Sequence, residues 1–285
     1  MIRNNPFCKE NDCLVALVTT PIGNKEDITL RALNFLKEAD IIACEDTRNT
    51  ALLLSSYEIK AKRLVSLYAQ TEAKGAVDLV REVKQKHLKL AYCSDAGMPG
   101  ISDPGALLVQ ACYQENVPVT ILPGPTASLS ALVLSGIDSA DFSFYGFLPT
   151  KAGQIKSMLT QLKDRKETLI FYESPKRFLK TLEIMKEVFS EEREVSLIRE
   201  LTKIHEEVVH GTLKELLAAH LEERGECVIV VKGSDKKEEL DEGFVLKEFK
   251  KGLQEGKSIS YLSKEIAAKY NLSKNEVYKI GLTLK

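Results

Sequence analysis

Short β-forming runs alternate with amphipathic segments along most of the chain, and this alternation constrains the fold more than any other feature. The first half has apolar runs at 14–18, 41–44, 64–67, 88–93 and 117–122. Each is followed by a polar or glycine-containing stretch and then by apolar residues at helical spacing. Such an order predicts a mostly parallel sheet with helices on its faces, and so an α/β class fold.

The alternation continues after residue 148. Residues 149–153 read as a linker, and further strands are expected at 168–172, 195–199, 205–210 and 227–231. We therefore predict an N-terminal α/β domain at 13–148 and a second α/β domain at 149–233. The second domain is expected to mix strand directions.

Residues 244–285 differ in character from the rest of the chain. They carry nine lysines against four glutamates, a local excess of +5, and follow a polar linker at 233–243. Three short helices fit this tail, with Ser273 and Glu276 in a capping-box pattern before the last. The pattern predicts a small helical module of helix-turn-helix type, and a solvated helical cap explains it equally well.

The loop at 94–105 reads Ser-Asp-Ala-Gly-Met-Pro-Gly-Ile-Ser-Asp-Pro-Gly and joins an expected strand to an expected helix. Its glycines permit tight turns or close approach to a ligand, and its prolines stiffen it. An ordinary connection of this kind needs about 2–6 residues. Because ligands of open α/β sheets bind at the carboxyl ends of strands, the loop predicts one wall of a binding site.

Composition excludes several classes of function. The net charge is −1, so no global basic field indicates a nucleic-acid partner, and any RNA contact must be local. The six cysteines form no Cys-x-x-Cys pair or zinc spacing, so no metal site is predicted. They are expected to be reduced, which predicts a cytoplasmic location. Neither a signal segment nor a membrane span is expected, and dinucleotide and Walker A glycine motifs are absent.

Four polar clusters follow strand-like runs. They are Glu45-Asp46-Thr47-Arg48, the loop 94–105, Glu173-Ser174-Pro175-Lys176-Arg177 and Arg199-Glu200-Leu201-Thr202-Lys203. Since the carboxyl ends of parallel strands share one edge, we expect these clusters to converge on one cleft.

These clusters, together with the segment from Thr20 to Leu33, resemble the motifs of the bacterial 16S ribosomal RNA cytidine-2′-O-methyltransferases of the tetrapyrrole methylase superfamily. Pro123-Gly124-Pro125, Gly146-Phe147-Leu148-Pro149 and Phe171-Tyr172-Glu173 continue the likeness in order. The resemblance covers about residues 13–232 and, more weakly, the tail.

The resemblance implies two α/β domains of tetrapyrrole methylase type with a cofactor cleft between them, plus the small C-terminal helical module. The implied cofactor is S-adenosylmethionine, and the implied assembly is a homodimer. The residues expected to bind the cofactor are Pro21, Asp95, Ala96, Gly97, Pro99, Ser102, Asp103, Pro123, Gly124, Pro125, Ala127, Tyr172 and Glu173. This chain departs from the family pattern at Met98, usually Thr, at Gly100, usually a larger aliphatic residue, and at Lys176, often His.

The implied reaction is methylation of a cytidine ribose 2′-hydroxyl in the decoding region of 16S ribosomal RNA, free or in the small ribosomal subunit. A general base would draw away the hydroxyl proton, and the candidates are Glu45, Asp46, Glu200, Lys203 and Glu206. The alternative is that Glu45 with Arg48, and Glu200 with Lys203, form ion pairs that only hold loops. Guanidinium groups match phosphate oxygens, so Arg48, Arg177 and Arg199 are the expected RNA contacts.

Two other functions compete with this one. The first is methylation of a small tetrapyrrole-like substrate, which would favour extra planar, aromatic surface, yet the chain has no Trp and only 7% aromatic residues. The second is RNA binding without catalysis, which predicts RNA binding in the absence of cofactor binding.

Overall fold

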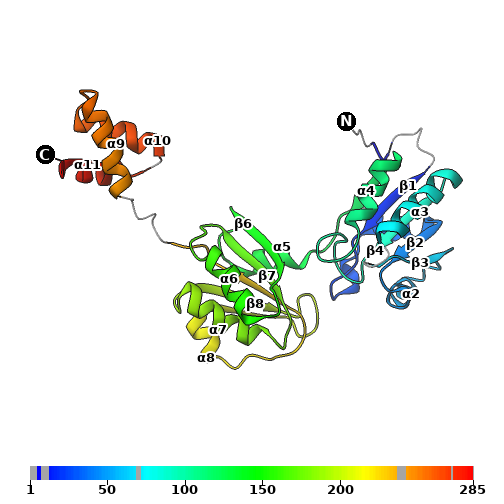
Figure 1. The fold of residues 1–285 in the computed structure, drawn as a ribbon. Helices are drawn as coiled ribbons and strands as arrows, with labels where there is room; N and C mark the ends of the chain where they lie inside the picture. Colours follow the sequence, from blue (N-terminus) through cyan, green and yellow to red (C-terminus); the bar gives the residue numbers. More distant parts are fainter. Residues whose placement is uncertain (1–4, 8–12, 69–71, 236–241, 271, 285) are drawn as a thin grey trace. The chain divides into compact units, whose positions relative to one another are not determined.

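The structure is a computed structural model of the chain, shown as a ribbon in Figure 1. It describes residues 5–7, 13–68, 72–235, 242–270 and 272–284, and the elements below are those of these ranges. Two compact units divide the chain, residues 1–234 and residues 235–285. In the described ranges no helix has both the length and the apolar character that crossing a bilayer requires.

The first unit contains two sheets, and the first of them is fully parallel. Its order is β3-β2-β4-β1-β5, which confirms the predicted parallel sheet. The strands are β1 Leu14–Val18, β2 Ile41–Cys44, β3 Leu64–Ser66, β4 Lys89–Cys93 and β5 Val119–Leu122. The helices of this lobe are η1 Lys25–Asp27, α1 Leu30–Glu38, α2 Thr47–Ser56, α3 Glu72–Lys86 and α4 Ala106–Glu115.

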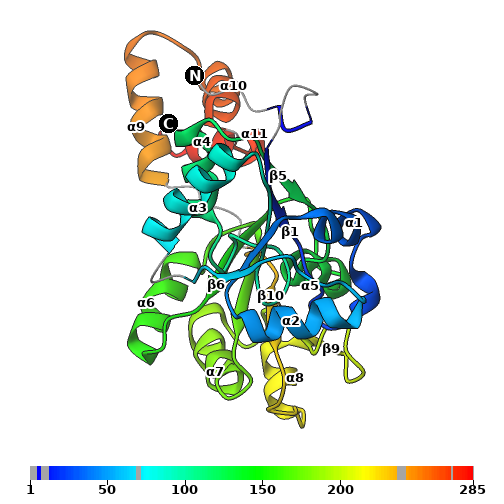
Figure 2. The ribbon, with the colours of Figure 1, turned by 90° about the vertical axis from the view of Figure 1, so that its right-hand side faces the viewer.

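Helices cover both faces of this sheet, because its strands are apolar on both sides. On one face Leu90 and Tyr92 of β4 pack with Leu108 of α4 and Val80 of α3. On the other face the sheet meets α1 and α2, whose Leu36 and Leu54 lie in one buried cluster with β2. Figure 2 shows the lobe from a second side. A sheet buried on both faces directs its ligand site to the strand ends.

The second sheet mixes strand directions, as the sequence predicts. Its order is β6-β7-β10-β8-β9, with β6 parallel to β7 and the remaining pairs antiparallel. The strands are β6 Phe142–Phe147, β7 Thr168–Glu173, β8 Glu194–Arg199, β9 Glu207–Thr212 and β10 Cys227–Val231. The helices are α5 Ala127–Ser135, α6 Ala152–Leu162, α7 Phe178–Phe189 and α8 Leu213–Ala218.

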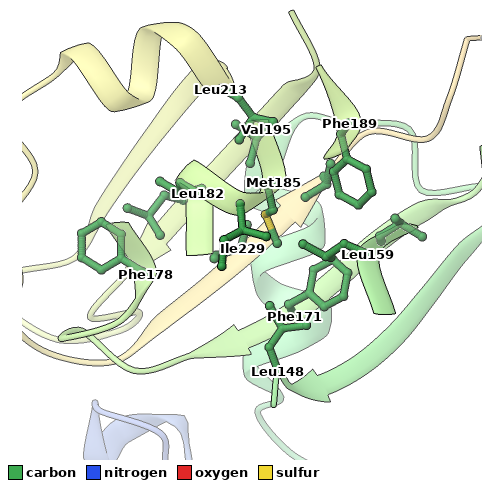
Figure 3. Packing of buried hydrophobic residues seen from close by; sticks show 14 of the residues in the cluster. Leu148, Leu159, Phe171, Phe178, Leu182, Met185, Phe189, Val195, Leu213 and Ile229 are labelled. Atoms are coloured by element: carbon green, nitrogen blue, oxygen red, sulfur yellow. The ribbon is translucent and has the colours of Figure 1, made fainter. Parts of the chain in front are cut away.

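One face of the second sheet builds the core shown in Figure 3, where Phe171 and Ile229 meet Leu159 of α6 and Met185 of α7. The other face packs on α5, through a cluster that contains Leu132. This corrects the predicted boundary at residue 148. Strand β6 pairs with β7, and α5 packs on the second sheet, so the first lobe ends after β5. The sequence pattern shows where a strand lies and not which sheet it joins.

The second unit is a three-helix module of α9 Glu242–Gln254, α10 Ile259–Tyr270 and α11 Lys274–Leu282. Val245, Phe249, Leu262, Ile266 and Val277 form its buried core. The three predicted helices are therefore present. The predicted capping box is not formed, because Ser273 is at the N-cap position of α11 without a side-chain capping hydrogen bond.

Candidate functional site

The two lobes of the first unit line a shared pocket of about 670 Å³, within the usual range of about 300–1,000 Å³ for small-molecule sites. The first lobe contributes Ile22 and part of the loop 94–105, and the second lobe contributes residues from α5, β6, β7, β8 and β10. The lining residues are Ile22, Asp95, Ala96, Gly97, Met98, Ile101, Ser102, Asp103, Thr126, Ala127, Ser128, Leu129, Phe144, Phe147, Tyr172, Glu173, Ser174, Pro175, Ile198, Leu201, Glu226, Cys227 and Val228.

The loop 94–105 is fastened to the end of β1. Thr20 and Gly97 exchange both backbone hydrogen bonds, with N···O distances of 3.0 and 3.1 Å. The Ser94 hydroxyl donates to the Gly97 carbonyl at 3.2 Å. Gly97 has φ +75°, and a Cβ added there would lie 3.1 Å from Cγ2 of Ile22. The loop thus presents backbone to the pocket in a conformation that favours glycine.

Three carboxylates gather beside the pocket, at the ends of β2 and β4. The pKa of Glu45 is raised by burial first, and then by the charges of Asp103 and Asp95. Burial likewise raises the pKa of Asp103, with a further contribution from Asp95. Asn49 of α2 donates a 2.9 Å hydrogen bond to Asp95. The mutual repulsion makes this corner of the site favourable for a cationic ligand.

Aromatic rings also line the pocket. Phe144 lies edge-on to Tyr172 with ring centroids 4.8 Å apart, and Phe147 contacts the same tyrosine at 5.5 Å. Burial raises the pKa of Tyr172, although hydrogen bonds to Ser128 act in the opposite direction. Apolar ring surface and carboxylates in one pocket suit a ligand that has both a flat ring and a positive charge.

Glu173 also borders the pocket, yet its carboxylate is engaged within the lobe. It is 2% exposed and accepts hydrogen bonds from the Ser174 amide at 2.8 Å, the Thr181 hydroxyl at 2.7 Å and Arg177 at 3.2 Å. Arg177 in turn donates to the Leu148 and Pro149 carbonyls at 3.0 and 2.6 Å. These contacts fix the start of α7 and the chain after β6. They favour a structural role for both side chains.

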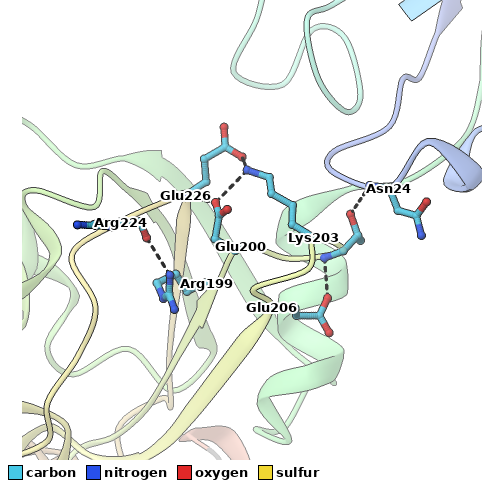
Figure 4. A network of polar contacts seen from close by, with 8 residues as sticks. Asn24, Arg199, Glu200, Lys203, Glu206, Arg224 and Glu226 are labelled. Carbon is cyan, nitrogen blue, oxygen red and sulfur yellow. Dashed lines mark hydrogen bonds and ion pairs between the residues drawn. The ribbon is translucent and has the colours of Figure 1, made fainter. Parts of the chain in front are cut away.

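The loop after β8 contacts the first lobe and has an unusual backbone conformation. Glu200 has φ +51° and Thr202 φ +66°, which is uncommon for residues with a side chain and is costly for a β-branched one. The Thr202 amide donates to Glu206 at 2.6 Å, and the Thr202 hydroxyl accepts from the Asn24 amide at 2.9 Å. Figure 4 shows these contacts. Backbone strain of this kind is common at functional sites.

Lys203 lies between two carboxylates in the same network. Its ammonium group is 2.9 Å from Glu200 and 3.1 Å from Glu226. Burial acts to lower the pKa of Lys203, but its hydrogen bonds to these carboxylates outweigh burial, and the pKa is raised. For Glu200, burial acts to raise the pKa, and the hydrogen bonds from Lys203 and the Glu226 amide lower it. Lys203 is therefore protonated and Glu200 ionised at neutral pH.

The structure brings together most of the residues expected to bind a cofactor. Eight of the thirteen line the pocket: Asp95, Ala96, Gly97, Ser102, Asp103, Ala127, Tyr172 and Glu173. The other five do not line it: Pro21, Pro99, Pro123, Gly124 and Pro125. Gly124 has a packing role, because a Cβ there would lie 3.0 Å from Cβ of Thr19.

The remaining expected site residues are dispersed. Asp46 caps α2 by accepting from the Arg48 amide, and its carboxylate pairs with the 88%-exposed Arg48 side chain at 3.0 Å. Arg199 donates to Glu207 at 3.0 Å and to the Arg224 carbonyl at 3.2 Å. Sequence reasoning did not include Phe144 or Ser128 in the site. The motif Gly146-Phe147-Leu148-Pro149 at the end of β6 could have indicated Phe144. No sequence feature indicated Ser128.

Comparison with known proteins adds to this geometry. Residues 14–217 match the family described as Tetrapyrrole (Corrin/Porphyrin) Methylases. The chain is 39% identical over 277 residues to the ribosomal RNA small subunit methyltransferase I of Streptococcus pyogenes serotype M1, covering 95% of both proteins. For that of Haemophilus influenzae the identity is 41% over 276 residues, covering 94% of this chain and 96% of the relative. The Thermotoga maritima enzyme of the same name is 42% identical over 222 residues, which cover 77% of this chain and 98% of the relative.

Solved structures share the fold at low sequence identity. The methyltransferase CobJ matches with a TM-score of 0.58 and 18% identity, over 79% of this chain and 96% of its own. A diphthine synthase matches with a TM-score of 0.59 and 14% identity, over 77% of this chain and 90% of its own. The chain therefore belongs to the tetrapyrrole methylase family and, within it, to the branch of the ribosomal RNA small subunit methyltransferases I.

Proposed function

We propose that the chain transfers a methyl group from S-adenosylmethionine to the ribose 2′-hydroxyl of a cytidine in small-subunit ribosomal RNA. The observation that carries this proposal is the identity of 39–41% over nearly the full length of relatives named ribosomal RNA small subunit methyltransferase I. The decoding-region cytidine and the choice of 2′-oxygen come from the motif resemblance. The pocket supports a small-molecule methyl donor.

The residues of the pocket fit S-adenosylmethionine by charge and shape. Asp95 and Asp103 offer carboxylates to a cation, and the rings of Phe144 and Tyr172 offer apolar surface to an adenine. Gly97 would hold the cofactor through backbone contact. When bound, the cofactor supplies an activated methyl group, so the contribution of the protein is chiefly positioning and proton removal.

Glu45 is the general base that the charges favour. Among the five candidates it alone has a pKa raised by burial and by neighbouring carboxylates. Asp46 is paired with Arg48, Glu206 accepts from the Thr202 amide, and Lys203 is protonated. In the proposed step Glu45 would accept the proton of the ribose 2′-hydroxyl, and the cofactor, when bound, would supply the methyl group that the 2′-oxygen takes up. A raised pKa strengthens a carboxylate as a base.

Replacement of Glu45 tests this assignment. We expect Glu45→Gln to lower kcat by about 10²–10⁴-fold with cofactor affinity retained, because one proton acceptor is lost. Asp46→Asn is the matched control and should keep most of the activity, since Asn also caps helices well. Single-turnover methyl transfer and calorimetric titration with S-adenosylmethionine measure the two effects. A fully active Glu45→Gln enzyme would assign the base elsewhere.

The homodimer and the cytoplasmic location are also proposals. Helix α5 exposes Val133 at 75% and Leu134 at 45%, an apolar surface that a second copy could cover. Cys13, Cys44, Cys93, Cys112 and Cys227 are free and buried, which suits a reducing compartment. Light scattering on the purified chain would determine its oligomeric state, and a monomer at working concentration would contradict the dimer.

A further inference from the structure

The three-helix unit has a hydrophobic core of its own. Its core residues Phe249, Leu262 and Ile280 come from α9, α10 and α11. The helices pack closely, since a Cβ at Gly252 would lie 2.2 Å from the Leu262 side chain. Every residue that lines the pocket precedes residue 229. The module thus folds around a core that is separate from those of the α/β unit.

The Thermotoga maritima relative is shorter than this chain. An alignment of 222 residues covers 98% of that protein and only 77% of this chain. The relative is shorter by more than the length of residues 244–285.

Helix α9 carries a row of lysines, here called the lysine stripe: Lys247, Lys250 and Lys251. The spacings of three and four residues place them on one side of the helix. All three are exposed, and the buried Val245, Phe249 and Gly252 lie on the opposite side. Among the described residues none of the three forms an ion pair or a side-chain hydrogen bond.

The negative group nearest the lysine stripe is already engaged. Glu248 lies between these lysines in sequence, and its carboxylate accepts from Tyr270 at 2.9 Å and pairs with Lys269 at 3.3 Å. Lys257 is likewise satisfied, by Glu255 and Glu265. The module therefore pairs some of its lysines internally, whereas the lysines of the stripe form no ion pair with a described residue; the charge of Lys251 acts on Glu248 only at longer range. Of the carboxylates at the ends of α9, Glu242 precedes the stripe and Glu255 follows it.

Charge distinguishes the tail from the rest of the chain. Residues 244–285 carry an excess of five positive charges, whereas the whole chain has a net charge of −1. Residues 1–243 therefore carry a net charge of −6, which opposes the approach of a polyanion. A separate basic surface compensates for this repulsion, because lysines that neutralise phosphates release counterions and so favour binding.

We propose that the lysine stripe of α9 binds the phosphodiester backbone of ribosomal RNA and so holds the substrate near the α/β unit. This inference rests on the proposed function for its substrate and adds the surface that recruits it. Three ammonium groups within about one and a half turns of a helix can contact neighbouring phosphates. Such contacts do not depend on the identity of the bases. Tethered binding of this kind raises the effective concentration of the target at the active site.

The test uses the full chain with Lys247→Gln, Lys250→Gln and Lys251→Gln combined. Glutamine has a helix propensity close to that of lysine, so α9 should remain folded, which thermal unfolding verifies. The matched control combines Lys37→Gln, Lys60→Gln and Lys180→Gln, three exposed lysines of the first unit that form no ion pair with described residues. Binding to protein-free 16S ribosomal RNA is measured across a salt series.

We plot the logarithm of the RNA association constant against the logarithm of the salt concentration. The slope should be shallower by about 2–3 in the stripe variant, because each lost phosphate contact removes about 0.7–0.9 from it. The control should keep the slope of the unmodified chain. KM for the RNA should rise with the dissociation constant, and kcat should stay unchanged. An unchanged slope overturns the proposal. A loss of affinity for assembled subunits alone, with protein-free RNA bound as before, also overturns it and indicates a protein partner.

Failure of this inference differs from failure of the proposed function. An enzyme that methylates its RNA normally, with an unaltered salt slope in the stripe variant, would refute only the recruiting surface. A chain that binds RNA through the stripe and transfers no methyl group would refute only the activity.

Discussion

Replacement of Gly97 by alanine tests how the loop 94–105 shapes the pocket. Gly97 has φ +75°, and the new Cβ would lie 3.1 Å from Cγ2 of Ile22. The left-handed conformation costs alanine about 1–2 kcal/mol. Leaving that conformation instead breaks the two hydrogen bonds with Thr20, at about 0.5–1.5 kcal/mol each. Either route destabilises the chain by about 1–3 kcal/mol and displaces pocket-lining backbone.

Gly136→Ala is the matched control for this prediction. Gly136 ends α5 with φ +68°, and a Cβ there meets no atom within 4 Å. Both variants should lose stability in urea unfolding, but only Gly97→Ala should lose cofactor affinity. We expect a loss of at least about tenfold, or 1.4 kcal/mol, in calorimetric titration with S-adenosylmethionine. Equal cofactor affinity in the two variants would refute the role of this loop.

Three further predictions follow from the same geometry. Gly23→Ala should destabilise the first unit by about 1–3 kcal/mol in urea unfolding, because its Cβ would lie 2.5 Å from the Thr202 hydroxyl and 2.9 Å from the Leu201 carbonyl; Gly153→Ala, in open space, should not. Glu173→Ala should cost about 3 kcal/mol, since it removes the partner of Arg177 and Thr181 from a buried site; a change below 1 kcal/mol would contradict the structural role. Asp103→Asn should raise Tm at pH 7. The pKa of Asp103 is raised in the folded state, so its ionisation subtracts stability as pH rises through that pKa, and the gain should vanish below the ordinary value of 3.8.

The sequence predicted the layers of the fold and the tight turns of the loop 94–105 well, because those features are local. Strands such as β1 and helices such as α4 follow from short-range periodicity. The loop 94–105 was identified by its glycines and prolines, and Gly97, Gly100 and Gly105 all have positive φ. Local chemistry determines such conformations, so one sequence suffices to predict them.

The partners of side chains could not be predicted in the same way. Glu173 and Arg177 are charged residues beside a predicted cleft, yet they fold inward onto Thr181, Leu148 and Pro149. The alternative that Glu200 and Lys203 form a loop-holding ion pair is confirmed, at 2.9 Å. The domain boundary was wrong because strand pairing between β6 and β7 is a long-range property. Such contacts depend on tertiary structure, which spacing along the chain does not encode.

Methyl transfer to isolated small ribosomal subunits tests the central claim most directly. Subunits that lack the modification would be incubated with the chain and labelled S-adenosylmethionine, and the labelled nucleotide would be mapped by mass spectrometry. We expect about one methyl group for each subunit, on the ribose 2′-oxygen of a cytidine in 16S ribosomal RNA. Label on a base, or no transfer to RNA together with turnover of a tetrapyrrole substrate, would contradict it.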